Sequence, residues 1–375
     1  MRIGIDARFY GTTGKGLGRY TQKLIEYLER FDQENEYVIL LRKENWDQYT
    51  PHNNNFHKVL ADYQWYTLQE QIQFPRLLSQ QKLDLVHFPH FNVPVFFKGK
   101  FIVTIHDLIL THYPTIRAST LSPILYMFKH RAYKYVITKA VKKAQKILTV
   151  SEFTKNDIIK HFHLTDPSRV AVTYEGVDIP NDIISNDEKD NLLKRFTITK
   201  PYVLYVGNVY PHKNLEKFIK AFKDIITRDK DLLFVLVGKE DYFFKRLRAQ
   251  VERTDLSKNI VFTGFVTDSE LFTLYANARL FVFPSLYEGF GLPPLEAMSA
   301  GTPVVASRAT SIPEVCGDAA VYFDPNNIYD MIQSVERVLT DEALRQNLIQ
   351  NGKKRIQDFH WDTMARETLD VYQTI

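Results

Sequence analysis

The sequence predicts an α/β protein built from two doubly wound domains. Short apolar segments typical of buried strands alternate with helical patterns over almost the whole chain. The alternation is interrupted once, by the polar stretch Ile179–Lys200, and a length of 375 residues suits two domains. We therefore expect a first domain at 1–180, a linker at 181–200, a second domain at 201–358, and a C-terminal helix at 359–375 that packs back on the first domain.

Each domain is expected to contain one parallel sheet covered by helices. The strands predicted in the first domain are Ile3–Asp6, Tyr37–Leu41, Leu83–His87, Phe101–Ile105, Lys146–Val150 and Val170–Thr173. The helices predicted there are Gly18–Arg30, Thr67–Gln80, Leu121–Lys143 and Glu152–Phe162. Ser151 is a good N-cap for the last of these helices.

The pattern restarts after the linker. The strands predicted in the second domain are Tyr202–Val206, Leu232–Val237, Ile260–Phe262, Leu280–Phe283, Pro303–Ala306 and Ala320–Phe323. The predicted helices are Leu215–Thr227, Tyr242–Thr254, Asp268–Ala276, Pro293–Ala300, Ile328–Leu339, Asp341–Phe359 and Trp361–Gln373.

Composition excludes several classes of protein. Hydrophobic residues make up 45% and charged residues 25% of the chain, which is typical of a globular protein. A net charge of +4 is too small to require a nucleic-acid partner, and no apolar stretch is long enough to span a membrane. Asp6 arrives too early for a signal peptide, and a single cysteine, Cys316, excludes an internal disulfide framework. A cytoplasmic location follows as the expectation.

One segment is strongly basic. No Asp or Glu occurs from Leu108 to Ser151. Basic and aromatic side chains alternate within 121–146, namely Lys129, Arg131, Lys134, Lys139, Lys142, Lys143 and Lys146 with Tyr126, Phe128, Tyr133 and Tyr135. Such a helix could rest on the anionic inner face of a membrane. The alternative is a solvated helix face whose aromatic side chains lie in the core.

The most informative motif follows the strand Leu280–Phe283. It is the run Pro284-Ser-Leu-Tyr-Glu-Gly-Phe-Gly-Leu-Pro-Pro-Leu-Glu296. Gly289 and Gly291 allow a ligand to approach the backbone closely, and the following helix start suits a phosphate. Glu288 and Glu296 could accept hydrogen bonds from hydroxyl groups on either side of that phosphate. The run therefore predicts a sugar-nucleotide site, although such loops also occur as plain helix starts.

Other polar residues also follow predicted strands, where doubly wound sheets bind ligands. His106-Asp107 follows one strand, and Gly207-Asn208 with Pro211-His-Lys213-Asn follows another. Lys213 could bind a phosphate as a mobile point charge, although a solvated surface lysine is the alternative. A lone histidine such as His106 is more often structural. His87 and His90 form an HxxH pair, but no further ligands at suitable spacing support a metal site.

The glycine-rich segment Gly11–Arg19 fits neither common phosphate loop. A dinucleotide fingerprint starting at Gly14 would need glycine at Arg19, and the next strand ends in Leu41-Arg42 without the acid that binds a ribose. A P-loop would need Gly-Lys-Ser/Thr where Gly16-Leu17-Gly18 stands. A flap that brings backbone amides to a pyrophosphate fits better, and a plain turn-rich loop is the alternative.

These motifs together resemble the family-four retaining glycosyltransferases, whose GT-B architecture has two Rossmann-like domains facing a central cleft. Glu288 and Glu296 match the family's E-x7-E motif. The matching runs are 283–306, Ile312–Val315, Val150–Phe153, Ile105–Leu108, and Val206-Gly207 with Pro211–Asn214. The similarity spans essentially the whole chain and is most specific in the C-terminal half.

The resemblance implies roles for individual residues. Glu296 is expected to hold the donor ribose, Glu288 to contact the donor sugar, Lys213 to bind the diphosphate, and His106 to contact the sugar near the reaction centre. The amides expected beside the donor are those of Gly16, Gly289, Phe290, Gly291 and Leu292, and the segment Gly264-Phe265-Val266 is expected along the base. Many members carry arginine where this chain has Asn208, so one phosphate-binding cation is missing or supplied elsewhere, with Arg19 as a weak candidate.

The predicted function is transfer of a hexose to a hydroxyl group of a glycan or lipid-linked glycan, with retention of configuration. The style of the motifs favours GDP-mannose as donor, and a UDP-sugar is the alternative. The family implies front-face attack, in which the leaving phosphate takes the acceptor proton, and needs no metal or other cofactor. A nucleotide-sugar epimerase and a non-catalytic nucleotide-sugar-binding protein remain rival interpretations. An NAD-dependent oxidoreductase is disfavoured by Arg19 and Arg42.

Overall fold

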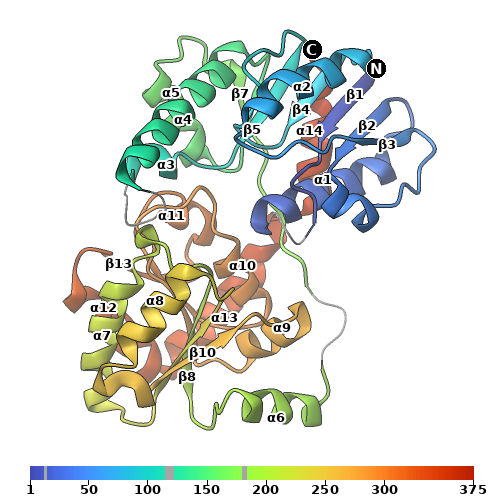
Figure 1. Cartoon of the computed structure of the whole chain (residues 1–375). Coiled ribbons are helices and arrows are strands. Elements are labelled where there is room, and N and C mark those ends of the chain that lie inside the picture. Colours follow the sequence, from blue (N-terminus) through green and yellow to red (C-terminus); the bar gives the residue numbers. More distant parts are fainter. Residues whose placement is uncertain (12–14, 115–121, 180–183) are drawn as a thin grey trace. The chain divides into compact units, whose positions relative to one another are not determined.

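The computed structural model describes residues 1–11, 15–114, 122–179 and 184–375, which form two compact units (Figure 1). Unit 1 contains Met1–Pro114, 122–176 and His360–Ile375, and unit 2 contains Val177–Phe359. The predicted α/β class with two Rossmann-like sheets is confirmed. In each unit the described strands form one sheet in which all pairs are parallel.

The unit 1 sheet has seven described strands in the order β3-β2-β1-β4-β5-β6-β7. They are β1 (Arg2–Asp6), β2 (Glu36–Leu41), β3 (Phe56–Leu60), β4 (Leu85–Phe88), β5 (Phe101–Ile105), β6 (Ile147–Thr149) and β7 (Val170–Val172). The strand order reverses between β1 and β4. This is the topological switch point, outside whose carboxyl edge ligands bind in such sheets.

The sequence prediction missed β3. Phe56 is buried, but His57 and Leu60 are exposed, so the apolar pattern of a buried strand is absent. β3 pairs only with β2 and forms an edge of the sheet. Edge strands commonly carry polar and basic residues because one side of their backbone is unpaired.

Six described helices belong to unit 1: α1 (Lys15–Phe31), α2 (Leu68–Gln80), α3 (Ile109–His112), α4 (Pro123–Lys143), α5 (Glu152–Phe162) and α14 (Trp361–Gln373). Ser151 caps α5, as predicted, because its side chain accepts a hydrogen bond from the Thr154 amide. The prediction that α1 begins at Gly18 was wrong. The helix begins at Lys15, so Gly16 and Gly18 are helical, while 12–14 of the predicted flap lie outside the described residues.

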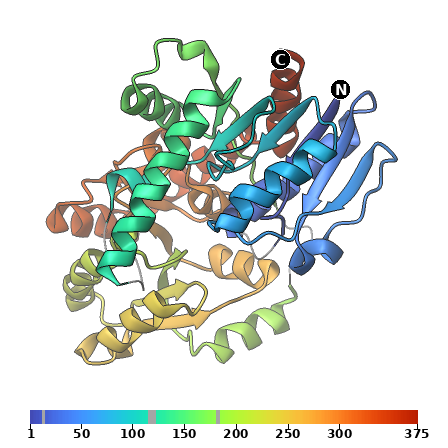
Figure 2. The same ribbon diagram turned by 45° about the horizontal axis from the view of Figure 1, so that its top comes forward.

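The helix α14 packs against α1 within unit 1, and both views show the two side by side (Figure 1 and Figure 2). The Arg366 guanidinium lies 3.7 Å from the centre of the Phe31 ring. Deeper in the unit, the Tyr372 hydroxyl lies 2.7 Å from Nδ1 of His87 on β4, and both residues are fully buried. The last residues of the chain thus complete the core built from the first hundred.

The unit 2 sheet has six described strands in the order β10-β9-β8-β11-β12-β13. They are β8 (Tyr202–Val206), β9 (Leu233–Val237), β10 (Ile260–Gly264), β11 (Leu280–Phe283), β12 (Val304–Ser307) and β13 (Ala320–Phe323). The described helices are α6 (Asn186–Arg195), α7 (Leu215–Arg228), α8 (Tyr242–Val251), α9 (Asp268–Ala276), α10 (Leu292–Ser299), α11 (Ile312–Cys316), α12 (Ile328–Thr340) and α13 (Glu342–Arg355).

Two helix predictions in unit 2 were wrong. The helix α11 was missed because it has only five residues, one of which is a proline. The helix predicted to run to Phe359 ends at Arg355, after which 356–358 form a 3₁₀ turn. No described helix is long and apolar enough to cross a membrane.

The backbone at Gly176 lies close to the backbone at Trp361, and this close approach leads to a prediction about stability. A Cβ atom on Gly176 would lie 2.2 Å from the Trp361 backbone nitrogen, so Gly176→Ala should lower unfolding free energy by about 1–3 kcal/mol. Gly16→Ala is the matched control, because nothing lies within 4 Å of its Cβ position and alanine favours a helix by about 0.5–1 kcal/mol. Urea unfolding followed by tryptophan fluorescence measures both. Equal midpoints for the two variants would contradict the close approach.

Candidate active site

Unit 2 carries the loop between β11 and α10, which contains the motif 284–296. Gly291 adopts φ = 115°, a left-handed conformation, and begins α10 without a side-chain cap. Pro293 and Pro294 occupy the first turn and bring no N–H group. Amide donors at this helix start must therefore come from the glycine-containing segment before the prolines and from Leu295.

Side chains that follow β12 hold this loop in place. The Ser311 hydroxyl lies 3.0 Å from the Glu288 carbonyl oxygen and 2.8 Å from that of Phe290, and its single proton is donated between them. Thr310 Oγ1 accepts a hydrogen bond of 2.9 Å from the Glu288 amide. Thr310 itself has φ = 53°, and Ser311 is fully buried. The conformation of Glu288 is therefore fixed from the neighbouring strand.

Lys213 and Glu288 form an ion pair at the carboxyl edge of the sheet. Lys213 ends the 3₁₀ turn Pro211–Lys213 that follows β8, and its Nζ lies 2.6 Å from Glu288 Oε1. Both side chains are largely buried, with 14% and 9% of their surface exposed. Asn214 adopts a left-handed conformation directly after Lys213, and its side chain is bonded to the Pro325 carbonyl, which fixes the start of α7.

The pair perturbs its neighbours. Burial and the nearby Lys213 charge lower the pKa of His212 to about 4. Burial and the Glu288 carboxylate raise the pKa of Tyr205 well above its ordinary value. The Tyr205 hydroxyl is donated to the Asn208 carbonyl at 2.6 Å. The Asn208 backbone is thus held in place beside the pair. Its side chain is neutral and cannot serve as a second cation.

The other predicted donor-binding residues of unit 2 lie at the same edge of the sheet. Glu296 is the fifth residue of α10, eight positions after Glu288 of the preceding loop, and its Oε2 accepts a hydrogen bond of 3.1 Å from the Tyr275 hydroxyl. Gly264 ends β10 with φ = 76°, Phe265 is 79% exposed, and Val266 is buried. Because the strands are parallel, the carboxyl ends of β8, β10 and β11 bring Lys213, Gly264 and Glu288 to one side of the unit.

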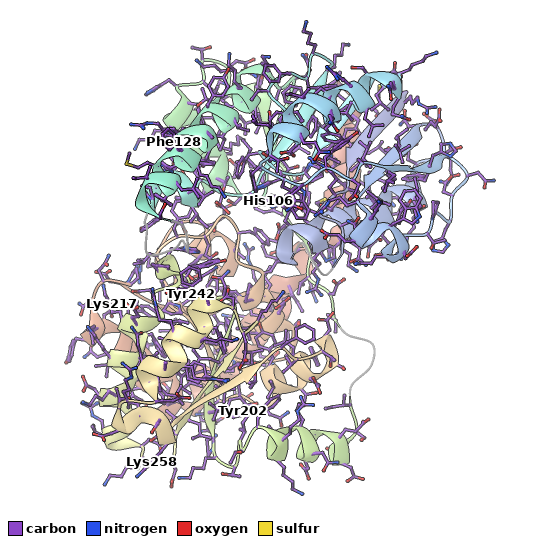
Figure 3. The ribbon with its side chains drawn as sticks, in the orientation of Figure 1. His106, Phe128, Tyr202, Lys217, Tyr242 and Lys258 are labelled. Carbon is purple, nitrogen blue, oxygen red and sulfur yellow. The ribbon has the colours of Figure 1, made fainter. Side chains whose placement is uncertain are left out.

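His106 and Gly16 belong to unit 1. His106 follows β5, and its ring is packed edge-on by fully buried Tyr20, with ring centres 4.7 Å apart (Figure 3). Nδ1 lies 3.1 Å from Glu175 Oε1, and Nε2 lies 3.0 Å from the Pro89 carbonyl oxygen. Both ring nitrogens are engaged within the unit, so neither can act as a general base without losing a partner. Gly16 is exposed in the first turn of α1.

Sequence reasoning missed Glu175 as a partner of His106. Glu175 is buried and follows β7, so the rule that polar residues after strands form the site would have found it. Thr310 and Ser311 were missed because side-chain bonds to the backbone leave no pattern in a sequence.

The HxxH pair has other partners. His87 Nε2 lies 2.8 Å from Thr104 Oγ1, and His90 Nε2 lies 2.9 Å from the Tyr66 hydroxyl. Burial, with the nearby His106, lowers the pKa of each to about 3. Among the described residues, no group of three or more His, Cys, Asp or Glu side chains could hold a metal ion.

Comparison with known proteins identifies the class. Residues 188–355 match the family described as glycosyl transferases group 1, and residues 14–180 match glycosyltransferase family 4. The O-antigen chain mannosyltransferase B of Escherichia coli is 31% identical over 306 residues, which cover 80% of this chain and 76% of that protein. The chain therefore belongs to the family-four glycosyltransferases, and it is a nucleotide-sugar-dependent hexosyltransferase.

Solved structures show the same fold. Sucrose-phosphate synthase from Thermosynechococcus elongatus superimposes with a TM-score of 0.77 at 18% identity, covering 100% of this chain and 98% of that one. The Anabaena protein Alr3699/HepE in complex with UDP-glucose gives a TM-score of 0.73 at 18% identity, with both chains fully covered. The fold is GT-B.

The Ser311 contacts generate a prediction about the loop. Ser311→Ala should lower unfolding free energy by about 1–3 kcal/mol, because two buried carbonyl groups lose their donor. Ser299→Ala is the control, since Ser299 is bonded only within its own helix and should change stability by about 0.5 kcal/mol or less. Chemical unfolding gives both values. Faster amide exchange confined to the segment 285–291 in Ser311→Ala should accompany the loss, and unchanged exchange there would contradict it.

Proposed function

We propose that this enzyme transfers mannose from GDP-mannose to a hydroxyl group of a glycan or lipid-linked glycan, with retention of configuration. The observation that carries the proposal is the Lys213–Glu288 pair in the loops before α7 and α10, with Glu296 in the second turn of α10. A cation, a helix start and two carboxylates on one sheet edge suit a sugar, a diphosphate and a ribose. The mannosyltransferase relative supports the choice of sugar.

In the proposed reaction each group has one task. Lys213 exchanges its Glu288 partner for the diphosphate and stabilises the negative charge that develops as the bond to the sugar breaks. Glu288 contacts the sugar hydroxyls, and Glu296 accepts hydrogen bonds from the ribose. The amides of Gly289, Phe290, Gly291 and Leu292 line the diphosphate side, with Asn208, and Gly16 contributes an amide from unit 1.

The remaining proposed contacts involve the sugar and the base of the donor. His106, whose ring is held by Glu175 and Pro89, contacts the sugar near the reaction centre. Gly264, Phe265 and Val266 lie along the base, which they contact mainly through their backbone. The leaving phosphate takes the acceptor proton on the same face, so no protein carboxylate forms a covalent bond to the sugar. Lys213 and the helix amides take the place of a metal, and the reaction is expected to proceed in EDTA.

The donor is the first point to test. A UDP-sugar is the second candidate, because a structural neighbour was solved with UDP-glucose. Thermal-shift measurements with GDP-mannose, GDP, UDP-glucose and UDP rank the nucleotides, and transfer assays with the best binder then identify the product. Conversion of the donor without an acceptor would instead indicate an epimerase. Binding without hydrolysis or transfer of any donor would indicate a non-catalytic protein.

The charged residues generate the central prediction. Lys213→Ala and Glu296→Ala should each lower kcat/KM for transfer by about 10²–10³-fold, since each removes a charged contact to the donor. Lys258→Ala is the matched control. Lys258 is an exposed lysine of unit 2 that precedes β10, at the amino ends of the strands (Figure 3). Near-wild-type turnover in either site variant, with the control also unchanged, would remove that residue from the site.

The basic helix α4 supports a peripheral membrane contact. Tyr133 packs against the core and Tyr126 is half-buried, but Ile124, Phe128 and Tyr135 are exposed, Phe128 by 63%, so two of the four aromatic side chains do not lie in the core. At 100° per residue these three side chains fall on one stripe with Arg131 and Lys142, opposite buried Ile137 and Ala140. Large apolar side chains flanked by cations, with no acid in the helix, suit an anionic bilayer surface. A lipid-linked acceptor at the inner face of a membrane and a cytoplasmic location complete the proposal.

Vesicle flotation tests the membrane contact. Phe128→Ser should weaken binding to vesicles of phosphatidylcholine with phosphatidylglycerol by about tenfold, from the lost burial of one aromatic side chain. Lys142→Gln should weaken it by about fivefold at low salt and less at high salt. The matched control is Tyr242→Ser, which removes an exposed aromatic side chain of α8 in unit 2 (Figure 3). Equal flotation of all variants, or none with the wild-type protein, would contradict a role for α4.

A further inference from the structure

Tyr66 is an exposed aromatic residue in a strained conformation. Its φ of 62° lies in the left-handed region, where bulky side chains are rarely found. The side chain is 59% exposed, so burial of the ring does not compensate for the strain. Such conformations persist only where surrounding contacts impose them, and they gather at functional sites.

Contacts of the Tyr66 backbone amide and of its hydroxyl group impose the conformation. Its backbone amide is donated to Glu70 Oε2 at 2.8 Å, and its hydroxyl lies 2.9 Å from His90 Nε2, in hydrogen-bond contact. Glu70 is fully buried and is held by Asn92 Nδ2 and by the Arg8 guanidinium, each at 2.7 Å. Tyr66 is therefore held at its backbone and at its hydroxyl group while more than half of its surface remains in solvent.

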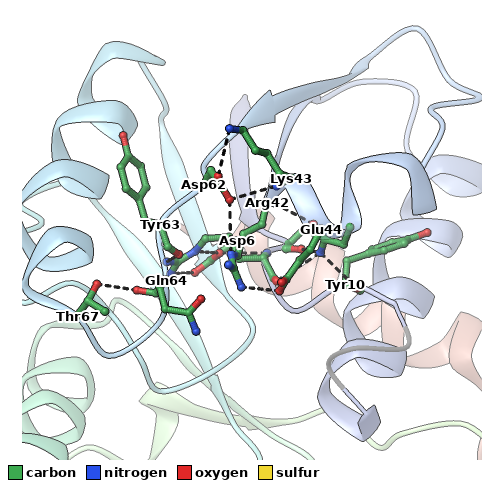
Figure 4. Close-up of polar contacts among 12 residues, drawn as sticks. Asp6, Tyr10, Arg42, Lys43, Glu44, Asp62, Tyr63, Gln64 and Thr67 are labelled. Atoms are coloured by element: carbon green, nitrogen blue, oxygen red, sulfur yellow. Dashed lines mark hydrogen bonds and ion pairs between the residues drawn. The ribbon is translucent and has the colours of Figure 1, made fainter.

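The segment that precedes Tyr66 is anchored as well. Asp62 lies beside Arg42 and Lys43, and the Thr67 hydroxyl is donated to the Gln64 carbonyl at 2.8 Å (Figure 4). The neighbouring Trp65 ring stacks on Phe9 with centres 4.3 Å apart. Tyr66 thus presents a rigid aromatic surface whose orientation is set before any ligand binds.

Within unit 1, Tyr66 is linked to His106 through the loop that follows β4. The Pro89 carbonyl accepts from His106, and Nε2 of the next residue, His90, lies 2.9 Å from the Tyr66 hydroxyl. β4 is one of the two strands at the switch point of the unit 1 sheet; Asp6 ends the other, β1, and Arg8 follows it. Exposed Leu68, at the start of α2, widens the apolar area beside Tyr66.

We propose that the exposed face of Tyr66 is a subsite on which a hexopyranose ring of the glycan acceptor stacks. One face of a pyranose presents several C–H groups, which pack on an aromatic ring, while its hydroxyl groups remain directed at the edge. A fixed tyrosine gives this contact at little entropic cost, because its side chain is already ordered. The inference rests on the proposed function and names the acceptor side of the same site.

Sugar binding without any nucleotide provides the first test. Saturation-transfer difference NMR with methyl α-D-mannopyranoside and an α-linked mannotriose should show transfer to the sugar C–H protons in the wild-type protein. Tyr66→Gly should lose most of this signal, since glycine accepts the backbone conformation and removes only the ring. Tyr66→Phe keeps the ring and should retain the greater part. Tyr242→Ala, on unit 2, should match the wild type. No transfer with the wild type, or equal transfer with Tyr66→Gly, would overturn the proposal.

Kinetics provide the second test and separate this proposal from the proposed function. In Tyr66→Gly the KM for the acceptor should rise by about tenfold, while hydrolysis of the donor in the absence of acceptor stays at the wild-type rate. Loss of hydrolysis together with transfer would show a general defect of the fold and count against an acceptor subsite. A wild-type protein that neither hydrolyses nor transfers from any nucleotide sugar would refute the proposed function, and the sugar-binding result would then still decide the subsite.

Discussion

The ion pair between Lys213 and Glu288 is the interaction around which unit 2 is organised. The two residues lie 75 positions apart in the sequence and are brought together because β8 and β11 are neighbours in one parallel sheet. A largely buried cation is costly without a partner, and so is a largely buried carboxylate. Each therefore holds the other at the sheet edge, and in the proposed reaction a diphosphate competes for the lysine. The hydrogen bonds of Thr310 and Ser311 with the Glu288 backbone hold this residue independently of the lysine.

How far the sequence predicts this site depends on the kind of interaction. Lys213, Glu288 and Glu296 could be predicted as site residues because glycine, proline and charge after an apolar strand form a pattern with a physical meaning. β3 was missed because an edge strand need not be apolar, and the early start of α1 was missed because glycine normally weakens a helix. Ser311 bonds through its side chain to the backbone carbonyls of Glu288 and Phe290, and only the folded chain shows these contacts. The strain at Tyr66 is likewise invisible, because tyrosine has no preference for left-handed backbone.

Unit 1 depends on a different constraint, because its helix α14 comes from residues that follow unit 2 in the sequence. After completing unit 2, the chain comes back to supply α14, and Tyr372 donates or accepts a buried hydrogen bond with His87 in the middle of the sheet. His87 in turn bonds to Thr104, whose Oγ1 also lies 3.2 Å from the Tyr20 hydroxyl, and the Tyr20 ring packs against His106. A continuous set of buried contacts therefore joins the C-terminal helix to the position of His106. The expected catalytic histidine is held by the whole unit, and its two ring nitrogens are already committed to Glu175 and Pro89.

Both units have left-handed backbone at the ends of strands or in the loops that follow them. Gly11, Gly207, Gly264 and Gly291 have positive φ values there, which glycine adopts without strain. Non-glycine residues share this conformation at Asn214, Thr310 and Tyr66, where each costs about 1–3 kcal/mol unless it is compensated. Side-chain to backbone bonds compensate at Asn214 and Thr310, and a carboxylate accepting the backbone amide does so at Tyr66. Strands and helices fix the positions of these turns, and the turns aim amides and side chains at one edge of each sheet. A sheet edge that keeps several unfavourable conformations, each with its own compensating bond, is organised for binding more than for stability.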